Sequence, residues 1–157
     1  MNRKTVPIDI AAVGHIMPLA KRAGETYKDL CSGIPAENGL YSLADAAEYF
    51  DEPGNEYARV HKKAITELKN HLLSLPLKTV QDLMTLMYLG RNGAFDVINS
   101  IPVHWRFRLY RNDKFRGGKD GIIKHMVGKS PVLYKYWKTG LQFMELGVNE
   151  NDEHGSD

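Results

Sequence analysis

A run of basic and aromatic side chains between positions 104 and 119 is the part of this sequence whose residue types could do chemistry. It combines one histidine with six Lys and Arg residues and four Trp, Phe and Tyr residues, namely His104, Trp105, Arg106, Phe107, Arg108, Tyr110, Arg111, Lys114, Phe115, Arg116 and Lys119. Arginine pairs with phosphate or carboxylate groups through two parallel hydrogen bonds, and an exposed aromatic ring stacks on nucleic-acid bases. The run therefore indicates a basic aromatic surface that meets an acidic protein surface or a nucleic acid.

We assign partner binding to the six cations of this run, Arg106, Arg108, Arg111, Lys114, Arg116 and Lys119. If the assignment holds, the arginines and the last lysine should reach solvent on one continuous surface. The alternative is that the arginines are ordinary surface charges and that the apolar residues between them belong to the core, namely Trp105, Phe107, Leu109 and Phe115.

Charge is unevenly distributed along the chain, although the net charge is only +2. Residues 91–140 carry 11 Lys and Arg against 3 Asp and Glu, whereas residues 141–157 carry 5 acidic residues and no Lys or Arg. Such asymmetry points to an acidic partner for the basic segment. Alternatively, the acidic end of the chain lies near the basic segment and neutralises it.

No catalytic residue, metal ligand or cofactor site is predicted from the motifs. The six histidines form no His-Glu-x-x-His pair, and the single cysteine, Cys31, cannot build a Cys-based zinc site. Gly128-Lys129-Ser130 resembles the end of a phosphate-binding loop, but Ile123 stands where that loop needs its first glycine. We therefore predict a non-enzymatic interaction module, of a kind common in phage and mobile-element genomes. The alternative is a small enzyme whose site a single sequence does not reveal.

Cysteine content and hydropathy bear on the compartment. A single cysteine allows no intramolecular disulfide, which is typical of a reducing compartment. The sequence contains no stretch of about 18 apolar residues, so we expect no membrane span and a cytoplasmic protein.

The spacing of apolar residues predicts a series of helices, with Gly and Pro marking their ends. The predicted helices cover residues 9–30, 42–50, 56–74, 77–89, 101–110, 120–127 and 130–144. Residues 101–110 also alternate in the manner of a strand. We assign them to a helix because a lone strand has no partner elsewhere in the chain.

Four residues predict local features of these helices. Pro18 should kink or break the first helix, because its ring presses on the carbonyl group of the preceding turn. Gly90 should end its helix in a left-handed conformation, and Ser130 should be the N-cap of the last helix. Gly140 weakens that helix and so should mark a close contact with another one.

The predicted architecture is a single all-α domain, a compact bundle of five to seven helices over residues 8–146. Residues 147–157 should form a disordered acidic tail, because residues 149–157 contain no apolar residue. Two helices joined by a short turn at Pro76 should supply the centre of the core through Leu68, Leu72, Leu83, Met84 and Met87.

Three blocks of the sequence resemble a widespread bacterial family known only as a domain of unknown function. The blocks cover residues 8–20, residues 75–93 with a Leu-Gly-Arg-x-Gly motif, and residues 125–141 with a Gly-x-Ser/Thr-Pro-x-Leu motif. The chain departs from the family in its Gly- and Pro-rich segment 31–55 and in the arginines around Trp105. The resemblance implies an all-helical fold and no particular activity.

Overall fold

The computed structural model describes residues 8–32, 54–93, 98–111 and 118–146, and within them the chain is helical, with no strand. Its elements are α1 (Ile10–Ser32), α3 (Glu56–Ser74), α4 (Leu77–Asn92), the short 3-10 helix η3 (Ile98–Ser100), α5 (Val103–Tyr110), α6 (Gly118–Val127) and α7 (Ser130–Phe143). The all-α prediction is confirmed. The predicted helix 42–50 and the predicted tail 147–157 lie outside the described residues.

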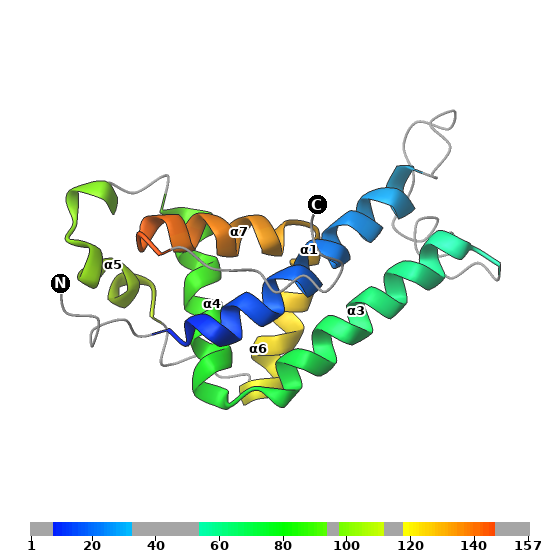
Figure 1. The fold of residues 1–157 in the computed structure, drawn as a ribbon, viewed down its shortest axis with the longest axis horizontal. Helices are drawn as coiled ribbons and strands as arrows, with labels where there is room; N and C mark the ends of the chain where they lie inside the picture. The colour runs from blue at the N-terminus through cyan, green and yellow to red at the C-terminus, as the bar shows by residue number, and fades with distance from the viewer. Residues whose placement is uncertain (1–7, 33–53, 94–97, 112–117, 147–157) are drawn as a thin grey trace.

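Helices α4 and α7 lie against each other at the centre of the bundle, and α1 packs on both α3 and α7. Figure 1 shows α1 and α3 side by side, projecting together beyond the other helices. Helix α5 lies at the opposite end of the molecule, next to the C-terminal end of α7. The bundle therefore places the arginine-rich helix at one extremity.

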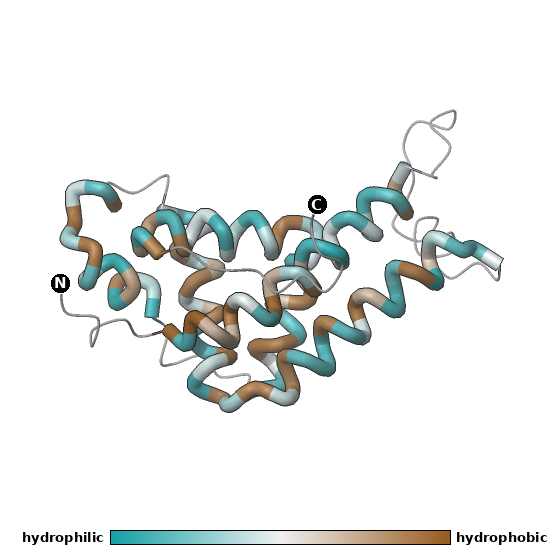
Figure 2. The backbone as a smooth tube through the Cα atoms, viewed as in Figure 1, coloured by the Kyte–Doolittle hydropathy of each residue, from teal (hydrophilic) through white to brown (hydrophobic). Residues whose placement is uncertain are grey.

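The core forms where α1, α3, α4, α6 and α7 meet. As predicted, one apolar cluster contains Leu68, Leu72, Leu83, Met84 and Met87, all of them buried. Along α3, apolar and polar segments alternate in Figure 2, which is typical of a helix with one buried side.

Leu83→Ala tests this core directly. Leu83 is completely buried in the cluster, so its truncation should lower the free energy of unfolding by roughly 2–5 kcal/mol. Urea unfolding of the two proteins measures the difference. An unchanged midpoint would mean that α4 does not present this face to the core.

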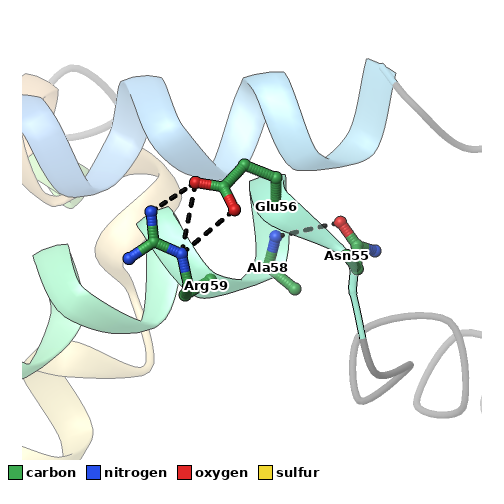
Figure 3. A network of polar contacts seen from close by, with 4 residues as sticks. All are labelled: Asn55, Glu56, Ala58 and Arg59. Atoms are coloured by element: carbon green, nitrogen blue, oxygen red, sulfur yellow. Dashed lines mark hydrogen bonds and ion pairs between the residues drawn. The ribbon is translucent and has the colours of Figure 1, made fainter.

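The first turns of α3 depart from the predicted apolar face. Tyr57 and Val60 fall on that face, yet 54% and 41% of their surface is exposed. In Figure 1, the start of α3 lies in the projecting part of the α1–α3 pair, which the other helices do not cover. The start of α3 is fixed locally instead: the amide of Ala58 donates to Asn55 Oδ1 at 3.1 Å, and Glu56 pairs with Arg59 (Figure 3).

Pro18 does not break α1, which is helical from Ile10 to Ser32. Buried residues flank the proline on both sides, among them Met17 and Ala20. Because these residues pack into the core with the rest of the helix, tertiary contacts outweigh the hydrogen bond that the proline removes. Asp9 caps the helix as its position suggests, accepting from the amide of Ala12 at 3.1 Å.

Gly90 is not a left-handed cap, because α4 continues through it to Asn92. Instead, it lies at the crossing of α4 and α7, where a Cβ atom would be 1.7 Å from the carbonyl oxygen of Tyr136. Gly140 lies on the other side of this crossing, and its Cβ would be 2.4 Å from the carbonyl oxygen of Leu86. The predicted close contact at Gly140 is confirmed.

The prediction that Ser130 is the N-cap of the last helix, α7, is wrong. Ser130 is its first helical residue and is buried, and Lys129 precedes it without a side-chain cap. Pro131 stands in the first turn, where a proline costs no helical hydrogen bond.

Candidate functional site

Helix α5 carries the centre of the predicted basic aromatic run, and its structure settles the ambiguity over residues 101–110 in favour of a helix. It follows Pro102 and spans eight residues. Phe107 is buried, as a core residue should be. The helix therefore has one face packed on the bundle and another turned to solvent.

Arg106 belongs to the packed face, so the prediction that it reaches solvent is wrong. Its side chain donates from Nε to the carbonyl oxygen of Ile101 at 2.8 Å, from Nη1 to that of Phe143 at 2.8 Å and from Nη2 to that of Asn99 at 3.3 Å. Only 8% of the residue is exposed. The planar guanidinium suits this task, since it presents several N–H groups in a fixed fork. Arg106 thus fastens α5 to η3 and to the end of α7.

Four residues form the exposed face of α5, which we call the α5 surface: His104, Trp105, Arg108 and Leu109. Trp105 is 47% exposed and Leu109 57%, so the alternative that both belong to the core is wrong. The two lie four residues apart on one side of the helix, as do His104 and Arg108. The remaining member of that alternative, Phe115, lies outside the described residues.

Arg108 and Trp105 are in direct contact. The guanidinium carbon of Arg108 lies 4.9 Å from the centroid of the indole ring, within the range of a cation–π interaction. The imidazole of His104 lies 5.7 Å from the same indole at an angle of 46°. The α5 surface is therefore a compact group of two rings, a cation and an aliphatic side chain.

Arg111 follows α5 directly and is exposed, but it also faces a carboxylate. Asp82 of α4 is buried, and burial raises its pKa, whereas its bond to Lys78 and the charges of Lys78 and Arg111 act in the opposite direction. The Nζ atom of Lys78 lies 2.8 Å from Asp82 Oδ2. Arg111 thus extends the positive charge of the α5 surface while helping to stabilise a buried carboxylate.

Lys119, another predicted partner-binding residue, does not join this group. Lys119 of α6 donates from Nζ to the carbonyl oxygen of Leu73 at 2.6 Å, in the last turn of α3. A cation there complements the negative end of the helix dipole, which is a structural role. Lys114 and Arg116 lie outside the described residues. Of the four predicted cations that the structure describes, Arg108 and Arg111 are exposed on or beside α5.

Sequence reasoning assigned neither apolar member of the surface to partner binding: Trp105 stood in the basic aromatic run with the core as the alternative, and Leu109 was considered only as a core residue. Trp105 and Leu109 looked like core residues, because a large apolar side chain is more often buried than exposed. The sequence contained one signal. His104 and Arg108 form a polar i, i+4 pair, which is typical of the solvent-facing side of a helix, and Trp105 and Leu109 are their immediate neighbours.

A polar pair away from the α5 surface joins α4 to α6. The hydroxyl group of Tyr88 lies 3.0 Å from His125 Nε2. Burial lowers the pKa of His125, and the charges of Lys129 and Arg91 lower it further. These cations lie near the C-terminal ends of α4 and α6, where positive charge complements the helix dipoles. Across the described part of the chain, no three His, Cys, Asp or Glu side chains lie so that they could hold a metal ion.

Comparisons with known proteins add no family or fold relative, since no family model, curated protein or solved structure matches the chain. The resemblance described above therefore rests on the three sequence blocks alone. Among the helices that the structure describes, none is both long enough and apolar enough to cross a membrane.

Proposed function

We propose that this protein is an interaction module that binds an acidic macromolecule through the α5 surface and Arg111. The observation that carries the proposal is that Trp105 and Leu109 are about half exposed beside two exposed arginines, Arg108 and Arg111. Large apolar side chains grouped at a surface mark an interaction site more often than scattered ones do. The same proposal includes a cytoplasmic location, with which the single cysteine of the chain agrees.

The composition of the α5 surface supports this function. Tryptophan and arginine are the residues most enriched among those that dominate binding energy at protein interfaces. The positive charges of Arg108 and Arg111 attract an acidic partner over a range set by the salt concentration. The surface therefore combines long-range attraction with apolar contact area.

The α5 surface is also preorganised. Three hydrogen bonds from Arg106, on the packed face of α5, hold the helix in place. The contact with Trp105 restrains the guanidinium group of Arg108. A partner then loses less free energy to the ordering of these side chains when it binds.

Charge reversal tests the proposed function. In the Arg108→Glu, Arg111→Glu double variant we expect loss of binding to two acidic probes, poly-L-glutamate and single-stranded oligo(dT), at least one of which the wild type binds. Wild-type binding should weaken between about 50 and 200 mM salt. Fluorescence anisotropy with labelled probes measures both effects. Arg108→Glu alone is the cleaner variant, because Arg111 also faces Asp82.

A matched control separates the α5 surface from overall charge. Lys62 and Lys63 of α3 are exposed, and reversing both changes the net charge by the same amount as the double arginine variant. We expect the lysine variant to bind like the wild type and the arginine variant to lose about tenfold or more. Equal losses in the two variants, or no dependence on Arg108, would contradict the proposal.

A further inference from the structure

Resting on the proposed function, we infer that the acidic partner is a protein that presents an amphipathic helix, with apolar residues on one side flanked by Asp and Glu. To bind such a helix, a surface needs apolar side chains beside positive charges. The α5 surface presents both on two turns of one helix. The inference concerns the class of partner, because charge alone attracts acidic proteins and nucleic acids alike.

Leu109 is the first observation that favours a protein. It is the most exposed of the large apolar residues that the structure describes, and with Trp105 it forms an apolar stripe of i, i+4 spacing. An amphipathic helix buries such a stripe with its own apolar residues at i, i+3 and i+4. A nucleic acid offers phosphate groups and flat base faces, which leave most of an aliphatic side chain without a partner.

The surroundings of Trp105 are the second observation. A base that stacks on tryptophan needs an open ring face. Here the guanidinium group of Arg108 already covers one face of the indole at 4.9 Å, and the ring of His104 lies 5.7 Å away. Contact with the edge and remaining area of the indole suits leucine, isoleucine or methionine side chains better than a base.

The positions of the charges complete the description of the partner. Arg108 lies next to the apolar stripe on α5, and Arg111 directly follows the helix. Eight helical residues span about 12 Å. The matching helix therefore needs two to three turns, with apolar residues at its centre and carboxylates on the side that meets the arginines.

Three probes distinguish the classes of partner. The first is a helical peptide with leucine at positions i, i+3, i+4 and i+7 and glutamate at most others. The second replaces these leucines by alanine and keeps the charge, and the third is oligo(dT). Tryptophan fluorescence reports on α5 because Trp105 is half exposed, whereas Trp137 is fully buried. Trp105→Phe is the control for the origin of the signal.

We expect the leucine peptide to bind about tenfold more tightly than the alanine peptide and to shift the Trp105 emission to shorter wavelength. Oligo(dT) should bind less tightly than the leucine peptide. Leu109→Ala should weaken the leucine peptide about tenfold without lowering the melting temperature, because the residue is exposed. Leu73→Ala, which changes an exposed leucine of α3, should leave binding unchanged.

The outcomes separate this inference from the proposed function. Equal binding of the two peptides, tighter binding of oligo(dT), or insensitivity to Leu109→Ala overturns the amphipathic helix. If binding of some probe still depends on Arg108, the interaction module stands without it. If no probe binds in an Arg108-dependent way, both fail.

Discussion

Gly90→Ala is expected to destabilise the protein by roughly 3 kcal/mol, because the added methyl group would overlap backbone atoms of the neighbouring central helix. Its Cβ atom would lie 1.7 Å from the carbonyl oxygen of Tyr136 and 2.9 Å from the amide nitrogen of Gly140. Both are backbone atoms of α7, so no side-chain rotation relieves the overlap. The two central helices must move apart, which opens the core around them.

The sign of this effect is what makes it informative. Alanine in place of glycine inside a helix ordinarily stabilises it by about 1 kcal/mol, because glycine loses more conformational entropy on folding. Gly24 of α1 is the matched control, since its Cβ would meet neighbouring atoms only at 3.4 Å. Urea unfolding should therefore show Gly90→Ala strongly destabilised and Gly24→Ala close to the wild type. Similar midpoints for the two variants would contradict the crossing.

Arg106→Ala is expected to cost roughly 3–5 kcal/mol of stability, because it removes three hydrogen bonds from a charged donor and each buried acceptor left unsatisfied costs about 1–3 kcal/mol. The change leaves the carbonyl groups of Asn99, Ile101 and Phe143 without this donor. It also releases α5 from the end of α7. The position of the α5 surface thus depends on a residue that is itself buried.

Two further variants test this role of Arg106. Lysine keeps the charge but not the planar fork, so Arg106→Lys should recover only part of the loss. Arg108→Ala removes an exposed arginine of the same helix and should change stability by no more than about 0.5 kcal/mol. Chemical denaturation gives these values, and the fluorescence of Trp105 reports whether α5 has moved. A loss in Arg106→Ala no larger than in Arg108→Ala would show that Arg106 does not anchor the helix.

The sequence was sufficient for the α-helices of the described residues and for the centre of the core. The apolar residues of α3 and α4 recur at helical spacing, and the two helices are joined by a two-residue connection. Such a connection keeps both helices in the same core, and Leu68, Leu72, Leu83 and Met87 all lie in one buried cluster. The cap at Asp9 is equally local, since it depends on an amide three residues away.

The assignment of individual arginines to core or surface depended on the tertiary structure. Arg106 and Arg108 are the same residue type, two positions apart in the same short helix, yet one is buried and the other exposed. What distinguishes them is the carbonyl oxygen of Phe143, 37 residues further along the chain. Because a guanidinium group satisfies buried carbonyls as well as it binds a partner's carboxylates, composition could not separate the two roles.

For the glycines and the apolar residues too, local sequence decided some features and tertiary contacts decided others. For the described residues, the sequence by itself determined that they are helical, about where the helices lie and which residues of α3 and α4 belong to the core, because periodicity and capping act over a few residues. Only the tertiary structure decided that Gly90 meets Tyr136 and that Trp105 and Leu109 remain exposed. These outcomes depend on which helices come to lie over a given face, and that is set by contacts between residues distant in the sequence.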